Sequence, residues 1–118
     1  MDYLIIGAGA AGVSAAKEIL KNRKKDDKIS IFTDENYPFY YRPRLIECLS
    51  GEVEVEEIII NDQQWFEDNN INLHLDEKIT EIDLGNKVIK SNSDQYNYDK
   101  LLLANGSNCF VPPFSGVD

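Results

Sequence analysis

Apolar and polar positions along the first third of the chain predict a strand, a helix and a second strand. Residues 3–6 form a short apolar run, typical of a buried parallel strand. Apolar residues at helical spacing predict an amphipathic helix over 10–24, and apolar residues over 28–33 predict the second strand. A helix between two strands in this order forms a right-handed crossover and a parallel pair.

The second half of the chain predicts one more parallel strand and an antiparallel unit. Strict alternation over 71–75 indicates a strand that places His74 on the face opposite its neighbours, and we interpret this lone histidine as a bystander. Strands over 79–84 and 87–90, joined by Gly85-Asn86, predict a β-hairpin.

Shorter patterns predict the remaining elements. Residues 96–98 are expected to add a further antiparallel strand, residues 101–104 a buried strand, and residues 110–118 a connection. The alternating stretch over 53–60 leaves its structure open.

Two short helices are expected in the middle of the chain. Pro43 suits the first turn of a helix over 44–49. Asn61 is the expected N-cap of a helix over 62–68, whose two large aromatic residues we expect in the core.

Three glycines follow the first strand at GxGxxG spacing, in the strand-to-helix context that makes this motif credible. Gly7 permits the tight turn, Gly9 lets a pyrophosphate approach the backbone, and Gly12 lets the helix pack closely on the strand. The free amides and the dipole at the helix N-terminus favour the negative charge of the phosphates. The motif predicts a dinucleotide but does not distinguish NAD from FAD.

Two acidic residues, Asp34 and Glu35, end the second predicted strand, a little over twenty residues after Gly12. A dinucleotide-binding fold places there the acid that accepts hydrogen bonds from the ribose hydroxyls, and an acid disfavours a 2′-phosphate. The spacing does not decide which of the two carboxylates has this role.

Composition and charge narrow the class of protein. The 118 residues, 42% hydrophobic and 28% charged, are typical of one soluble globular domain. The net charge of −9 argues against nucleic acid or an anionic membrane surface as a partner, and no apolar run is long enough to span a membrane. With no charged-then-apolar leader, we expect a cytoplasmic protein. Cys48 and Cys109, with one histidine, indicate neither a disulfide framework nor a metal site.

The segment 36–45 is rich in aromatic residues and contains two arginines, Arg42 and Arg44. Its composition fits equally well an aromatic loop packed on the core and a cofactor wall with an arginine clamp.

Four segments are similar, in this order, to motifs of one family: IIGAGAAG (5–12), ISIFTDE (29–35), PFYYRPRL (38–45) and YDKLLLANG (98–106). Together they resemble the N-terminal FAD-binding segment of the flavoprotein pyridine-nucleotide oxidoreductases, above all the NADH:rubredoxin oxidoreductases and the nitrite reductase large subunits. The last two segments are similar to the family's aromatic-x-Arg-Pro and Tyr-Asp-x-Leu-(apolar)₂-Ala-Thr-Gly motifs. Because these are more specific than the glycine motif, the resemblance favours FAD over NAD.

The resemblance implies a role for each part of an FAD site. The residues implied to hold the pyrophosphate are Gly7, Ala8, Gly9, Ala10, Ala11 and Gly12. Asp34 or Glu35 would bind the adenosine ribose, and Arg42 would contact the cofactor. The backbone of Ile79 would border the adenine. The small residues implied to pass close to the cofactor are Ala104, Asn105 and Gly106.

The implied fold is α/β, a Rossmann-like FAD/NAD(P)-binding domain whose parallel sheet carries an inserted antiparallel β-meander between its third and fourth strands. Family enzymes contain a second glycine motif for NAD(P)H, and this chain has one. We therefore expect residues 1–118 to be the N-terminal portion of an incomplete FAD-binding domain, without the NAD(P)H domain. Weak or absent FAD retention and self-association through an exposed sheet edge are expected.

Two positions and one missing motif depart from the family pattern. Asn105 replaces the usual Thr, Glu47 stands where relatives often carry a Lys, and the Cys-x₄-Cys pair of the disulfide reductases is absent. We therefore expect no thioredoxin-reductase or glutathione-reductase type of active site, and we assign no catalytic acid or base and no metal.

The implied function is that of a flavoprotein oxidoreductase, in which electrons pass from NAD(P)H through FAD to an acceptor such as rubredoxin or a nitrite-reducing centre. The 118-residue chain alone is expected to be inactive, since it has no second dinucleotide site. Two alternatives are a stand-alone NAD(H)-binding module and a non-catalytic Rossmann-like domain. The Arg42-Pro43 segment and the inserted hairpin argue against the first alternative.

Overall fold

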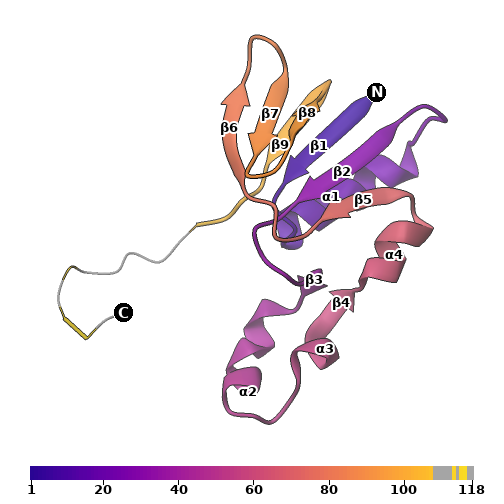
Figure 1. Ribbon diagram of the computed structural model, residues 1–118. Coiled ribbons are helices and arrows are strands. Elements are labelled where there is room, and N and C mark those ends of the chain that lie inside the picture. Colours follow the sequence, from indigo (N-terminus) through magenta and orange to yellow (C-terminus); the bar gives the residue numbers. More distant parts are fainter. Residues whose placement is uncertain (108–112, 114, 117–118) are drawn as a thin grey trace.

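The central sheet of the protein is parallel and has four strands. The computed structural model describes residues 1–107, 113 and 115–116, so most of the connection expected over 110–118 lies outside the described residues. The strands are β1 (Asp2–Ile6), β2 (Lys28–Phe32), β5 (Ile71–His74) and β9 (Lys100–Leu103). Their spatial order is β5-β2-β1-β9 (Figure 1), the Rossmann order, and this confirms the predicted α/β fold class.

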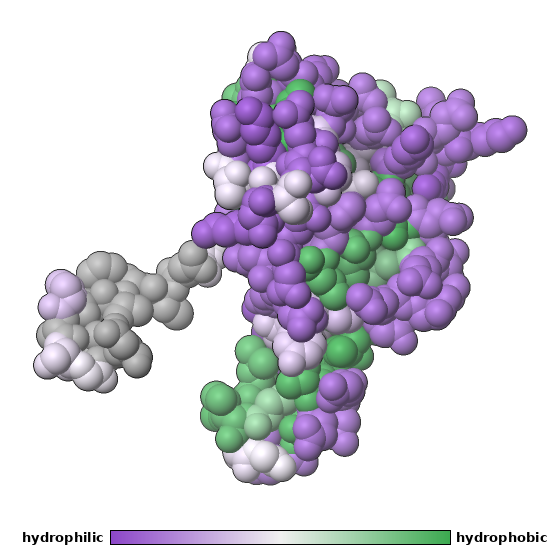
Figure 2. Space-filling view, viewed as in Figure 1, coloured by the Kyte–Doolittle hydropathy of each residue, from purple (hydrophilic) through white to green (hydrophobic). Residues whose placement is uncertain are grey.

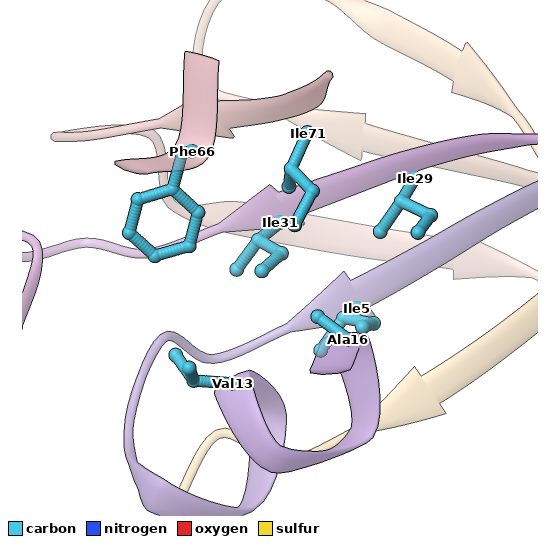
Figure 3. Packing of buried hydrophobic residues seen from close by; sticks show 7 residues of the cluster. All are labelled: Ile5, Val13, Ala16, Ile29, Ile31, Phe66 and Ile71. Carbon is cyan, nitrogen blue, oxygen red and sulfur yellow. The ribbon is translucent and has the colours of Figure 1, made fainter. Parts of the chain in front are cut away.

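One face of this sheet is covered by α1 (Ala10–Lys21), which connects β1 to β2 (Figure 1). The apolar stripe of α1 meets inward-facing isoleucines of the sheet and an aromatic ring of α4 (Gln63–Asp68) (Figure 3). The buried cluster consists of Ile5, Val13, Ala16, Ile29, Ile31, Phe66 and Ile71. Full burial of a large apolar side chain contributes roughly 1.5–3 kcal/mol, so the strand before the glycine motif is firmly anchored.

The helix α1 is shorter than the predicted 10–24 because the chain turns after Asn22, its C-cap. In this turn the buried carboxylate of Asp27 accepts a hydrogen bond from the backbone N–H of Lys24 at 3.0 Å. That hydrogen bond lowers the pKa of Asp27, and the terminal ammonium of Met1, 3.3 Å away, acts in the same direction. The turn therefore ties the start of β1 to the end of α1.

The inserted antiparallel sheet consists of β6 (Ile79–Asp83), β7 (Val88–Ser91) and β8 (Gln95–Asn97). It lies between β5 and β9 in the chain, as predicted, and packs on the parallel sheet through a second cluster. The buried members of this cluster are Leu4, Phe32, Ile89 and Tyr98.

The turn of the β6–β7 hairpin differs from the predicted two-residue turn at Gly85-Asn86. The loop has four residues, 84–87, because the carboxylate of Asp83 accepts hydrogen bonds from both the backbone N–H (3.1 Å) and the side-chain amide (2.8 Å) of Asn86. The residue with positive φ is Lys87, at 52°, and neither residue of the predicted turn has one.

A projecting segment over residues 39–61, called the arm below, extends from the end of the sheet (Figure 1). Its elements are β3 (Phe39–Tyr40), η1 (Arg42–Arg44), α2 (Leu45–Leu49), α3 (Val55–Ile58) and β4 (Ile59–Asn61). The predicted helix over 44–49 is present, preceded by the short 3-10 turn η1. The antiparallel β3–β4 pair and α3 fall in stretches for which the sequence predicted no strand or helix.

Apolar side chains cover much of the arm's surface (Figure 2). Ile46 and Leu49 on α2 are 72% and 89% exposed, and neither η1 nor α2 has a buried residue. The arm is therefore held mainly by its β3–β4 pairing rather than by a core of its own.

The helix α4 begins one residue later than predicted, and its N-cap is Asp62 rather than Asn61. The side chain of Asp62 accepts a hydrogen bond from the backbone N–H of Trp65 at 2.9 Å, while Asn61 is a buried residue of β4. Of the two aromatic residues expected in the core, Phe66 is 1% exposed and Trp65 packs half-buried against the same cluster.

The last parallel strand, β9, was predicted to be buried, and this was wrong. Among the described residues β9 pairs only with β1, so it forms one edge of the sheet. Leu102 is 41% exposed and Leu103 is 58% exposed. An apolar run predicts a strand, but it does not predict whether both faces of that strand are covered.

No helix within the described ranges is both long enough and apolar enough to cross a membrane.

Candidate functional site

A cleft of about 640 Å³ opens at the carboxyl ends of β1, β2 and β9, where the loops after these strands meet. Ligands bind at this edge in open α/β sheets. All the site residues predicted from the sequence line this cleft except Gly12. The predicted residues that line it are Gly7, Ala8, Gly9, Ala10, Ala11, Asp34, Glu35, Arg42, Ile79, Ala104, Asn105 and Gly106.

Two of the three motif glycines are required by the protein's own packing. Gly7 has a φ of 114°, and a Cβ atom there would overlap the backbone carbonyl of Ala104. A Cβ atom at Gly12 would overlap the carbonyl oxygen of Gly7, so Gly12 lets α1 pack against the strand-to-helix turn. Gly12 is buried below the cleft and has the packing role that the sequence assigned to it.

Gly9 is different, because no atom of the described residues would overlap a Cβ there. The nearest atoms to a Cβ at this position are Nη2 and Nε of Arg42, at 3.8 and 3.9 Å, which is ordinary contact. Gly9 is the N-cap of α1 and supplies no capping side chain, so the first amides of the helix stay available to an anion. This open cradle of backbone amides fits a pyrophosphate.

Three side chains form an acid corner on the arm side of the cleft: Glu35, Tyr40 and Arg42. Arg42 donates to the hydroxyl of Tyr40 at 2.8 Å, and both Arg42 (3.3 Å) and Tyr40 (3.2 Å) donate to one carboxylate oxygen of Glu35. Burial raises the pKa of Tyr40, and the neighbouring carboxylate of Glu35 raises it further. Asp34 is exposed at the rim, so both acids border the cleft and the ribose assignment stays a prediction.

The remaining walls are held by backbone hydrogen bonds. The N–H of Ala104 donates to the carbonyl oxygen of Ile6 at 2.7 Å, which continues the β1–β9 pairing into the cleft. Opposite it, the N–H of Glu77 donates to the carbonyl oxygen of Thr33 at 2.9 Å and places Ile79 at the cleft wall. Backbone hydrogen bonds therefore hold in place the segments that carry Ala104 and Ile79, for which contacts with a cofactor are predicted.

Sequence reasoning missed six residues of the lining: Ile6, Phe32, Thr33, Glu77, Lys78 and Ser107. Ile6 and Phe32 end β1 and β2, and Thr33 directly follows β2. The rule that ligands bind at the carboxyl ends of parallel strands would have found all three. Glu77 and Lys78 lie in a loop without a motif, and no sequence signal pointed to them.

His74 takes part in packing next to the cleft, and its interpretation as a bystander stays a prediction. Its ring stacks on Phe32 at 4.4 Å between ring centres, and its Nδ1 lies 3.5 Å from a carboxylate oxygen of Glu77. Burial, followed by the nearby carboxylate of Glu77, raises the pKa of Tyr96 to about 12, so this phenol is neutral at physiological pH.

Glu47, the position at which the resemblance implied a departure from the family pattern, is not part of the cleft lining. Its carboxylate lies 2.7 Å from Nη2 of Arg44, and this ion pair raises the pKa of Arg44. Within the described residues its side chain therefore serves the arm and not the cleft.

Residues 1–118 match the family described as pyridine nucleotide-disulphide oxidoreductase. The nitrite reductase (NAD(P)H) of Bacillus subtilis (strain 168) is 39% identical over 118 residues, covering 99% of this chain and 15% of that protein. The NADH-rubredoxin oxidoreductase of Clostridium acetobutylicum is 42% identical over 105 residues, covering 88% of this chain and 27% of that protein.

Solved structures of other proteins superpose on this chain. The crystal structure of NADH:rubredoxin oxidoreductase from C. acetobutylicum superposes with a TM-score of 0.83 at 40% identity, covering 95% of this chain and 30% of that chain. An NAD-dependent persulfide reductase from A. fulgidus superposes with a TM-score of 0.88 at 30% identity, covering 100% and 24%.

This chain thus spans between 15% and 30% of the length of these relatives. The family match extends over all 118 residues and includes the four segments that carry the sequence resemblance. The chain belongs to the pyridine nucleotide-disulphide oxidoreductase family.

Proposed function

We propose that this chain is the N-terminal FAD-binding portion of an NAD(P)H-dependent flavoprotein oxidoreductase. The observation that carries the proposal is the cleft itself, in which the open amide cradle at Gly9, the acid corner and the Ala104–Gly106 loop surround one space. Three separate segments of the chain meet there at the edge of the sheet where α/β folds bind nucleotides.

Each wall of the cleft suits one part of the cofactor. The amides at the start of α1 and the guanidinium of Arg42 suit the pyrophosphate, because both offer N–H donors to its oxygens. Asp34 or Glu35 suits the ribose hydroxyls, and the Ile79 backbone suits the adenine edge. Ala104, Asn105 and Gly106 leave room beside the cofactor because their side chains are short or absent.

The chemistry of the whole protein follows from its cofactor. When bound, FAD supplies a hydride acceptor for NAD(P)H and a donor of electrons to an acceptor such as rubredoxin or a nitrite-reducing centre. The residues that line the cleft would bind and orient that cofactor, and none of them is assigned an acid–base step. We also propose that the protein acts in the cytoplasm.

We also propose that the 118-residue chain associates through the edge of β9. Its exposed side chains, Leu102 and Leu103, and its outer edge, which pairs with no strand of the described residues, are features that favour pairing with another strand. Sedimentation at increasing concentration tests this, with a rising average mass expected and a concentration-independent monomer contradicting it.

Equilibrium dialysis against FAD, read by flavin absorbance, tests the cofactor proposal. Saturable uptake approaching one FAD per chain, stronger than uptake of NAD⁺ under the same conditions, is expected. Tight uptake of NAD⁺ without flavin would favour a stand-alone NAD(H) module, and uptake of neither nucleotide would favour a non-catalytic domain. Either result contradicts the proposal.

A further inference from the structure

The acid corner is a directional hydrogen-bond relay. The guanidinium of Arg42 only donates, the carboxylate of Glu35 only accepts, and the hydroxyl of Tyr40 does both. It accepts from Nη1 of Arg42 at 2.8 Å and donates to Oε1 of Glu35 at 3.2 Å. Tyr40 therefore fixes both the position and the rotation of the guanidinium.

Two further contacts restrict Arg42. Its Cζ lies 4.8 Å from the ring centre of Tyr40, within range of a cation–π interaction. Its Nη2 lies 3.3 Å from Oε1 of Glu35, which places a negative charge on the same side as the tyrosine. Ring, hydroxyl and carboxylate together hold the arginine from the arm side of the cleft.

A second edge of the guanidinium, formed by Nε and Nη2, faces the glycine motif. The two nitrogens nearest to a Cβ at Gly9 are Nη2 and Nε of Arg42, at 3.8 and 3.9 Å. This Nε/Nη2 edge is one of the two-pronged donor edges with which arginine binds the oxygens of a phosphate. Nε makes no hydrogen bond within the described residues.

The backbone of Tyr40 is anchored independently of the cleft. Tyr40 lies in β3 opposite Ile59 of β4, and the N–H of Tyr41 donates to the carbonyl oxygen of Ile58 at 2.8 Å. The short β3–β4 pair thus fixes the point from which the tyrosine side chain reaches Arg42. Tyr40 itself is not part of the cleft lining.

We propose that Tyr40 is a positioning residue, which turns the Nε/Nη2 edge of Arg42 toward a phosphate bound at the glycine motif. This inference rests on the proposed function, since the phosphate is that of the dinucleotide. It assigns a purpose to the β3–β4 pair, because that pair fixes the tyrosine that orients the arginine.

A double-mutant cycle measured by FAD titration tests the role of Tyr40. Tyr40→Phe keeps the ring and removes the hydroxyl, and we expect it to weaken FAD binding roughly fivefold, the effect of one hydrogen bond to a charged group at a partly exposed site. In an Arg42→Ala background the same substitution should change the affinity less than about twofold, because the group that it orients is gone. Tyr41→Phe is the matched control, since Tyr41 is 50% exposed and its hydroxyl makes no hydrogen bond in the described part of the chain.

The outcomes separate the two proposals. If the wild-type chain takes up no FAD, the proposed function and this inference both fail. If the wild-type chain binds FAD and Tyr40→Phe binds it equally well, or weakens it as much in the Arg42→Ala background, only the inference fails. Thermal unfolding of Tyr40→Phe accompanies the titrations, and a loss of affinity explained by partial unfolding at the assay temperature also contradicts a positioning role.

Discussion

The cleft has two walls that are built in different ways. The glycine wall, residues 6–12, follows a strand buried in the main core, and its shape is set by backbone overlap that only glycine avoids. The arm wall presents Arg42 to the cleft. It stands on the two-stranded β3–β4 pair and is shaped by the hydrogen bonds of Arg42 with Tyr40 and Glu35. One wall is therefore rigid because of the fold, while the other depends on a few polar contacts.

The largest expected effect comes from adding a methyl group to the rigid wall. Gly7→Ala places a Cβ on the carbonyl of Ala104 and forces a non-glycine residue to a φ of 114°. We expect the free energy of unfolding to fall by about 2–4 kcal/mol, measured by urea denaturation.

The matched control is Gly85→Ala, because Gly85 has no positive φ and its nearest neighbour would be in ordinary contact at 3.5 Å. Equal destabilisation by both substitutions would show that the overlap at Gly7 is not decisive.

A smaller effect, confined to binding, is expected from Gly9→Ala. The φ of −86° suits alanine and the space around it is open, so stability should change by less than about 1 kcal/mol. FAD binding should weaken by roughly tenfold or more, since the methyl group keeps a phosphate from the helix amides. Ser14→Ala, an exposed position of α1, is the control for both measurements. Unchanged FAD affinity in Gly9→Ala would contradict the role of this cradle.

The arm wall rests on β4, and the N-cap of α4, Asp62, directly follows that strand. Removing this cap tests how much it stabilises the chain there. Asp62→Ala deletes the acceptor for the N–H of Trp65, and we expect a loss of about 1 kcal/mol in the free energy of unfolding. Asp62→Asn should retain most of the stability, since asparagine caps equally well. If Asp62→Asn lowers the free energy of unfolding as much as Asp62→Ala does, the capping hydrogen bond is not what stabilises the start of α4.

The smallest effect concerns Asp27, in the turn between α1 and β2, and depends on pH. The hydrogen bond from Lys24 lowers the pKa of Asp27 below its ordinary value of 3.8 in the folded chain. The ionised carboxylate therefore stabilises the fold above the unfolded-state pKa, and this contribution is lost as the pH falls through the lower folded-state pKa. The stability gap between wild type and Asp27→Asn should narrow from pH 7 toward pH 2, as measured by urea denaturation. A gap that widens on acidification would reverse this assignment.

The two walls also differ in how well the sequence predicted them. The strand, glycine motif and α1 were predicted because apolar periodicity and glycine spacing are local signals, and the third-strand alternation over 71–75 was equally clear. The β3–β4 pair was missed because β3 has only two residues and β4 three, too short for any period to appear. The side-chain contact between Glu35 and Arg42 joins residues on different elements, which no spacing rule foresees.

The sequence also failed to predict features at the sheet edge and in the turns. The exposure of β9 depends on which strands stand beside it, and its apolar sequence does not contain that information. The four-residue hairpin loop and the Asp62 cap both arise where an aspartate side chain captures nearby N–H groups. Asn61 was the predicted cap and Gly85-Asn86 the predicted turn. The side chains that accept the hydrogen bonds are instead those of Asp62 and Asp83.

The central claim is that the cleft binds FAD through the amides of the glycine wall, and an NMR titration of the ¹⁵N-labelled chain with FAD tests it directly. The account predicts saturable shifts of the Gly9, Ala10 and Ala11 amide resonances, which persist when an equal concentration of NAD⁺ is added. Weak affinity does not obscure this result, because the shifts report binding in fast exchange. Amides of the glycine wall that do not respond to FAD, or that respond more strongly to NAD⁺, would contradict the claim.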